Sequence, residues 1–126
     1  MPEHPSGQLT LRTIAMPADA NPNGDIFGGW LLAQMDLAGS VLAYDQADGR
    51  VATIAIDAMS FLAPVMVGDL VSCYAEIERI GNTSIRVKVE TYATRRAEHE
   101  LIKVTEGMVT YVAIDEDRKP RPVPKG

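Results

Sequence analysis

The sequence predicts a single α+β domain in which an antiparallel sheet of about five strands wraps around one long central helix. Residues 30–44 are apolar on all sides of a helix and contain no proline. Most of the chain after them alternates between apolar and polar residues, which is the period of a β-strand. A chain of 126 residues, 46% of them hydrophobic, can bury one core without a metal or a disulfide. We therefore expect residues 1–126 to form one domain, with an ordered core over residues 9–124.

The elements are expected in a simple order along the chain. Residues 8–16 alternate and form a first strand, which Pro17 ends. Residues 17–28 form a loop, because they hold the turn-forming pairs Asn21-Pro22, Asn23-Gly24 and Gly28-Gly29. The helix is expected to begin near Gly29. Four strands then follow, over residues 51–61, 70–80, 85–93 and 101–114.

Two details of the sheet follow from the same pattern. A hairpin turn at residues 81–83 places Glu78 opposite Arg86 and Glu76 opposite Lys88 on the solvent side. The last strand contains a glycine, Gly107, that is expected to mark a bulge. Because an open antiparallel sheet leaves edge strands and one uncovered face, we expect at least a dimer.

Composition and motifs exclude several classes of function. Seventeen acidic and twelve basic residues give a net charge of −5, which disfavours nucleic acid as a partner. The single cysteine, Cys73, rules out an intramolecular disulfide and a cysteine-based zinc site. The histidines His4 and His99 fall in a tail and a polar turn, and common nucleotide, nucleophile-elbow and metal motifs are absent, so no metal is expected. The apolar segment is too short and too polar to cross a bilayer, and the first residues do not resemble a secretion signal. We expect a cytoplasmic protein with no membrane partner.

The C-terminal residues 117–126 are basic and rich in proline. One interpretation is a solvated tail, which this composition typically forms. The other is a segment whose cations lie against an anionic ligand.

Asp36 is the candidate catalytic residue. It is a carboxylate in the middle of an apolar helix, where an unpaired charge is costly. The alternative is structural: Asp36 caps a buried amide while the small residues on its helix face pack closely against a neighbouring backbone.

The loop before the helix supplies a second candidate part of a site. Gly28 and Gly29 let the backbone approach a ligand, and the first amides of a helix can bind an oxyanion. Asn21 has a side-chain amide that can orient water, although an Asn before Pro more often serves only the turn. Asp36 follows Gly28 by eight positions, about 12 Å along a helix, so one carbonyl cannot touch both. If two chains pack with antiparallel helices, the site is shared between subunits.

A longer segment carries a family resemblance. Asn21-Pro22-Asn23-Gly24-Asp25-Ile26-Phe27-Gly28-Gly29-Trp30, followed by Gln34-Met35-Asp36, resembles the signature of hotdog-fold acyl-CoA thioesterases of the YciA type. The similarity covers roughly residues 9–124. It implies a helix wrapped by a sheet, a dimer as the minimal active unit and a hexamer built as a trimer of dimers. It also implies hydrolysis of acyl-CoA to a free carboxylic acid and CoA, with no cofactor because CoA is part of the substrate.

The resemblance further implies roles for individual residues. Asp36 matches the catalytic carboxylate, acting as general base or as nucleophile. Gly28 or Gly29 matches the oxyanion amide, and Asn21 matches the residue that holds water or substrate. Ser40, one turn after Asp36, matches a hydroxyl that helps to orient the water. The CoA phosphates require cations, and the available groups include Arg86, Lys88, Arg95, Arg96 and Arg121.

Two other functions compete with the thioesterase. A hydratase or dehydratase on the same fold is disfavoured because no histidine lies in the helix or in the loop before it. A non-catalytic acyl-CoA-binding or oligomer-forming domain gains nothing from a buried carboxylate. For Arg86 and Lys88, pairing with Glu78 and Glu76 is the role that competes with phosphate binding.

Overall fold

The structure, a computed structural model, describes residues 5–95 and 99–125. Within them the chain forms one long helix, one short 3-10 helix and five strands, which confirms the predicted class. In chain order the elements are β1 (Gln8–Ile14), η1 (Pro17–Asp19), α1 (Gly28–Ala47), β2 (Val51–Phe61), β3 (Leu70–Ile80), β4 (Ser84–Thr94) and β5 (Leu101–Ala113).

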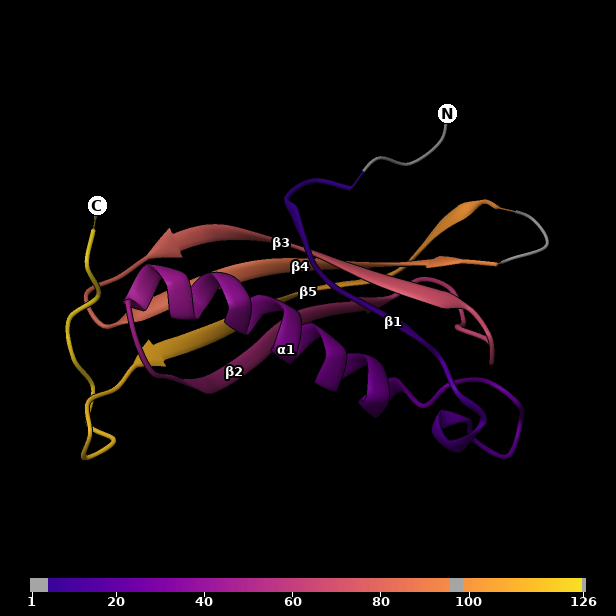
Figure 1. Ribbon diagram of the computed structural model, residues 1–126, viewed down its shortest axis with the longest axis horizontal. Helices are drawn as coiled ribbons and strands as arrows, with labels where there is room; N and C mark the ends of the chain where they lie inside the picture. The colour runs from indigo at the N-terminus through magenta and orange to yellow at the C-terminus, as the bar shows by residue number, and fades with distance from the viewer. Residues whose placement is uncertain (1–4, 96–98, 126) are drawn as a thin grey trace.

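The five strands form one antiparallel sheet in the order β1-β3-β4-β5-β2, and α1 lies across one face of it (Figure 1). β1 and β2 are therefore the edges of the sheet. Among the described residues β2 pairs only with β5, so its outer edge presents unpaired backbone groups there.

The helix α1 buries only the side that faces the sheet. Met35 and Ala38 are fully buried there, and the small alanine lets the helix approach the strands closely. On the other side Leu37, Val41 and Tyr44 are 56%, 45% and 48% exposed. The expectation that the helix is buried on all sides is therefore wrong for a single chain, because five strands cover one face only. An exposed apolar face of this kind is typical of a surface that another chain covers.

The register of the β3–β4 hairpin differs from the prediction at one of two pairs. Glu76 lies opposite Lys88, as expected. Arg86 lies opposite Arg79 instead of Glu78, because an irregularity in β3 shifts the pairing by one residue. The side chains of Glu78 and Arg86 nevertheless form an ion pair at 3.0 Å.

The bulge predicted at Gly107 lies in the neighbouring strand. Gly107 itself pairs regularly with Val89 of β4, whereas two residues of β2, Ala58 and Met59, stand opposite it where one would fit a regular ladder. A side chain at position 107 would collide with the Met59 sulfur, which fills that space. The glycine therefore accommodates a bulge in β2 and does not form one in β5.

The C-terminal segment is docked on the domain at Val123, while its cations Arg118, Lys119 and Lys125 are exposed, as in the solvated-tail interpretation. Val123 is only 5% exposed and joins the core. Its amide donates to the carbonyl oxygen of Asn82 at 2.8 Å. The segment, yellow in Figure 1, passes the C-terminal end of α1. There the Gln46 side chain donates to the carbonyl oxygen of Pro124 at 2.7 Å.

Candidate functional site

Two cavities lie along the seam between α1 and β2. The first, here called the N-terminal cavity, has a volume of about 390 Å³. It is lined by Asn21, Asp25, Ile26, Gly28, Leu31, Phe61, Leu62, Ala63, Pro64 and Val65. The second, the central cavity, has a volume of about 240 Å³. It is lined by Asp36, Leu37, Ser40, Tyr44, Val51, Thr53 and Tyr111.

The N-terminal cavity contains the uncapped start of α1. The residue before the helix, Phe27, makes no side-chain capping bond. Within the described part of the chain, the amides of Gly28 and Gly29 have no hydrogen-bond acceptor. A Cβ atom at Gly29 would meet nothing within 4 Å, so its backbone is open to a ligand. These amides carry the positive end of the helix dipole and suit an oxyanion.

Asn21 serves the turn, and it also lines the N-terminal cavity. Its Oδ1 accepts from the backbone amides of Asn23 at 2.9 Å and Asp25 at 3.2 Å. This oxygen therefore stabilises the turn, which is the structural role that the sequence left open for Asn21. Its Nδ2 makes no hydrogen bond to any residue that the structure describes, and it remains available as a donor.

The central cavity holds the carboxylate of Asp36 in a defined orientation. Thr53 Oγ1, from β2, donates to Asp36 Oδ1 at 2.7 Å. Among the described residues Oδ2 has no partner, so it is free to accept from a bound molecule. One turn later, Ser40 Oγ donates to the carbonyl oxygen of Leu37 at 2.6 Å, which leaves its lone pairs as acceptors.

Two neighbours of Asp36 were missed by the sequence reasoning. Thr53 is a hydroxyl in the largely apolar run of β2, and that contrast is the signal that marks it. Tyr111, from β5, donates its hydroxyl to the main-chain oxygen of Asp36 at 2.6 Å. Burial, aided by the nearby Asp36 carboxylate, raises the pKa of Tyr111 far above its usual value. Tyr111 is therefore a donor at all ordinary pH values.

The two groups of predicted residues lie in separate cavities. Asn21 and Gly28 line the first, and Asp36 and Ser40 line the second. Asp36 follows Gly28 by eight positions, about 12 Å along the helix. A single chain therefore does not bring the two groups of predicted residues together.

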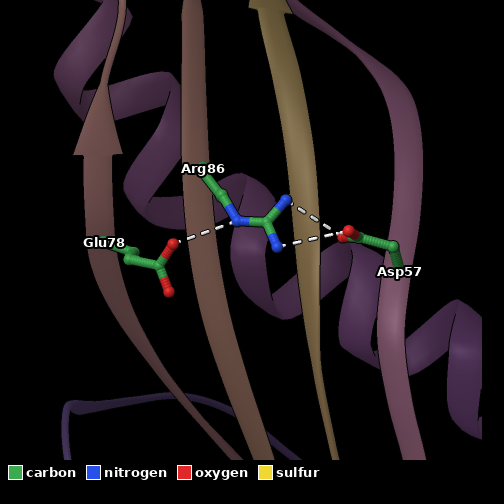
Figure 2. A network of polar contacts seen from close by, with 3 residues as sticks. All are labelled: Asp57, Glu78 and Arg86. Atoms are coloured by element: carbon green, nitrogen blue, oxygen red, sulfur yellow. Dashed lines mark hydrogen bonds and ion pairs between the residues drawn. The ribbon is translucent and has the colours of Figure 1, made fainter.

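Arg86, one of the predicted phosphate ligands, lies in an ion-pair network. Its guanidinium binds both carboxylate oxygens of Asp57, at 3.0 and 3.2 Å, and its Nε binds Glu78 at 3.0 Å. Figure 2 shows the side chain reaching across β5 toward Asp57, with α1 behind the sheet. This network is on the face away from the helix. Lys88, two residues further along β4, lies on the same face.

The other predicted cations are scattered. Arg95 Nη2 donates at 3.1 Å to the carbonyl oxygen of Pro64, which lines the N-terminal cavity. Arg95 Nε is 3.4 Å from the Asp69 carboxylate. Arg121 Nε donates to the carbonyl oxygen of Ile114 at 3.0 Å, beyond the opposite end of the helix. Arg96 lies outside the described residues.

Neither a metal cluster nor a membrane span is found in the part of the chain that the structure describes. Across residues 5–95 and 99–125, no three His, Cys, Asp or Glu side chains are grouped to hold a metal ion. None of the helices in these ranges combines the length and the apolar character needed to cross a membrane.

Comparison with known proteins identifies the class. A sequence profile of the Thioesterase superfamily matches residues 23–98, a range that includes Gly28 and Asp36. The chain belongs to this superfamily. A named relative is the acyl-CoA thioester hydrolase YciA of Salmonella typhimurium, which is 50% identical over 127 residues. That alignment covers 98% of this chain and 96% of the relative.

Solved structures agree with the family at the level of the fold. The hexameric thioesterase y2039 of Yersinia pestis is 49% identical with a TM-score of 0.93, covering 98% of this chain and 100% of that one. Cj0915 of Campylobacter jejuni, described as a hexameric hotdog fold thioesterase, is 45% identical with a TM-score of 0.88. The alignment with Cj0915 covers 94% of this chain and 91% of that one. The present chain has the hotdog fold.

Proposed function

We propose that this chain is an acyl-CoA thioester hydrolase, which uses water to release a free carboxylic acid and CoA. The observation that carries the proposal is the Asp36 carboxylate, oriented by Thr53 in a cavity of a chain that is 50% identical to a named acyl-CoA thioester hydrolase. A thioester carbonyl is already electrophilic and a thiolate leaves readily. One base and one oxyanion site therefore suffice, and the reaction as proposed needs no cofactor.

Asp36 acts on the attacking water in this proposal. Because Thr53 occupies Oδ1, Oδ2 is the oxygen that accepts the proton from water as it attacks the thioester carbonyl. The lone pairs of Ser40 help to orient that water. The oxyanion that forms binds the amides of Gly28 or Gly29, and its collapse expels the CoA thiolate, which takes up the proton. If Asp36 acts as nucleophile instead, Oδ2 forms a mixed anhydride that water then hydrolyses.

Two copies paired through β2 would complete the site. β2 runs antiparallel to α1: Thr53 contacts Asp36, and the Phe61 ring lies 3.4 Å from where a Cβ atom of Gly28 would be. In an antiparallel pair of β2 edges centred near Asp57, position 53 of one chain stands opposite position 61 of the other. The Gly28 amides of one chain then lie beside Asp36 of its partner.

The exposed apolar groups favour the same assembly. Ile54 of β2 is 59% exposed, and the Leu37, Val41 and Tyr44 side of α1 is also uncovered. Pairing at β2 gives these groups a neighbour and removes an open sheet edge. Since the relatives from Yersinia pestis and Campylobacter jejuni are described as hexamers, we propose that three such dimers form a hexamer.

Arg95 is the best supported of the predicted phosphate ligands. It is anchored to Pro64 at the edge of the N-terminal cavity, where a CoA chain leaving the site would pass. For Arg86, the ion pairs to Asp57 and Glu78 are the competing role. The phosphate roles of Lys88, Arg96 and Arg121, and the cytoplasmic location, stay predictions from the sequence.

A thiol-trapping dye tests the proposal directly. Incubation with acyl-CoA esters of different chain lengths should release free CoA and reveal the preferred chain length. Asp36→Asn keeps the shape and can still accept from Thr53, but it should lower kcat by about 10²- to 10⁴-fold. Asp45→Asn, an exposed change on the same helix, is the matched control and should leave kcat unchanged.

Two outcomes would contradict the proposal. Near-normal turnover by Asp36→Asn would reject the chemical role of the carboxylate and favour the structural one. Tight binding of acyl-CoA without CoA release from any ester would indicate a non-catalytic binding domain.

A further inference from the structure

Tyr111 and Asp36 are joined by a contact that the proposed chemistry does not use. Tyr111 is fully buried in β5, and its hydroxyl donates at 2.6 Å to the main-chain oxygen of Asp36. That oxygen belongs to the middle of α1, where the helix already supplies an amide four residues further on. The tyrosine thus adds a second donor from the sheet at the residue that carries the proposed base.

Gly39 makes room for this contact. A glycine inside a helix makes the helix less stable than an alanine would. A buried glycine at such a position therefore indicates that a side chain would not fit there. A Cβ atom at Gly39 would lie 2.5 Å from the Tyr111 hydroxyl and 3.2 Å from ring atom Cε2. The missing side chain therefore lets the tyrosine reach the helix backbone.

The two contacts fix Asp36 from different strands. Thr53 of β2 holds the carboxylate, and Tyr111 of β5 holds the backbone of the same residue. A hydrogen bond to the backbone resists both sliding and rotation of α1 over the sheet at this turn. Displacement of a catalytic group by about 1 Å can cost about 10²-fold in rate, so the position of this turn matters.

We infer that Tyr111 is a positioning residue for thioester hydrolysis, which holds the Asp36 turn of α1 against the sheet through the gap left by Gly39. The inference rests on the proposed function. Tyr111 touches no reacting atom in this scheme. It acts through Asp36, so its loss should slow the chemical step and leave substrate binding intact.

Tyr111→Phe tests the inference because it removes the hydroxyl and keeps the ring. We expect kcat to fall about 10-fold with KM changed less than about 2-fold. Tyr92→Phe is the matched control: Tyr92 is also fully buried, on neighbouring β4, with its hydroxyl 3.5 Å from Glu90. The melting temperature measures the structural cost of each change, and Tyr92→Phe should keep the wild-type kcat. Equal kcat values for the two variants would overturn the inference.

Gly39→Ala provides a second, independent test. Its methyl group should displace the Tyr111 hydroxyl and lower kcat by itself. Because both changes break one contact, the Tyr111→Phe/Gly39→Ala double variant should have a kcat no lower than that of Gly39→Ala alone. Multiplicative losses would contradict the shared contact. If Gly39→Ala does not fold, Tyr111→Phe still decides the matter.

The outcomes separate this inference from the proposed function. An inactive Asp36→Asn variant together with a fully active Tyr111→Phe variant removes only the positioning role. An active Asp36→Asn variant, or a wild type that releases no CoA, removes both.

Discussion

Asp36 owes its defined position to residues far from it in the sequence. Its carboxylate accepts from Thr53, 17 positions away, and its main-chain oxygen accepts from Tyr111, 75 positions away. Only Oδ2 is left without a partner among the described residues. A carboxylate held in this way offers one oxygen to a ligand in a fixed direction, which is what a base for water requires.

Replacement of Thr53 by Val should reduce catalysis by removing the bond that orients the carboxylate. We expect kcat to fall about 10- to 100-fold, since a hydrogen bond to a charged group contributes about 1.5–3 kcal/mol. Steady-state kinetics with the preferred acyl-CoA is the measurement. The control is Thr10→Val, which removes another threonine hydroxyl bonded to α1, at the carbonyl oxygen of Ala38 (2.9 Å). An equal loss of kcat in both variants would mean that Thr53 only supports the helix.

At the scale of the elements, a buried carboxylate joins the N-terminal segment to β4 and β5. Glu90 of β4 is 5% exposed and accepts from Ser6 through its amide at 3.0 Å and its hydroxyl at 2.6 Å. Lys103 of β5 lies 2.7 Å from the other carboxylate oxygen. Burial works to raise the pKa of Glu90, but the bonds from Lys103 and Ser6 outweigh it and lower that pKa to about 2.

This network predicts an acid-dependent loss of stability. The pKa of Glu90 is lower in the folded chain than its usual value of 4.5. The contribution of Glu90 to the free energy of unfolding is therefore complete above pH 4.5 and is lost as the pH falls toward 2. The full contribution is about 3 kcal/mol. Denaturant unfolding between pH 6 and pH 2 should show that the free energy of unfolding falls less steeply with acid in Glu90→Gln than in the wild type. Glu76→Gln, which removes an exposed carboxylate on the adjacent strand, is the control and should keep the pH dependence of the wild type.

The C-terminal segment should contribute to stability through Val123. Because this side chain is 5% exposed in the core, Val123→Ala should lower the free energy of unfolding by about 1–3 kcal/mol. Lys125→Ala, an exposed change in the same segment, should alter it by less than about 0.5 kcal/mol. Thermal unfolding compares the two variants. Indistinguishable melting temperatures would show that Val123 contributes no more to stability than an exposed residue of the same segment.

At the scale of the whole molecule, the decisive feature is the separation of the two groups of proposed site residues. The uncapped amides at Gly28 and the Asp36 carboxylate line different cavities of one chain. The unpaired edge of β2 and the exposed apolar side of α1 provide a surface through which a second copy can bring them together. Activity is therefore expected to belong to the assembly and not to the single chain.

Complementation tests the shared site. Asp36→Ala should be inactive alone, and so should Gly28→Trp, whose side chain is large enough to block the oxyanion amides. Mixed dimers contain one site with both faults and one with neither, so an equal mixture should recover about a quarter of wild-type activity after subunit exchange. Native mass spectrometry confirms the exchange. A mixture that contains mixed dimers and stays inactive would show that each chain carries its whole site.

The sequence by itself determined the elements and the candidate chemistry. Alternation and turn pairs predicted the five strands, the hairpin at residues 81–83 and a helix that begins near Gly29. A charge in an apolar helix singled out Asp36, and its eight-residue distance from Gly28 predicted two half-sites. These properties are local, since they depend on the period and spacing within one segment.

Tertiary structure decided what surrounds those residues. The contacts of Thr53 and Tyr111 with Asp36, the bulge of β2 opposite Gly107 and the docking of Val123 each join segments that are distant along the chain. Periodicity shows which side of a strand is apolar. It does not show which distant side chain will meet it, because that depends on strand order, register and the one face of the sheet that α1 covers.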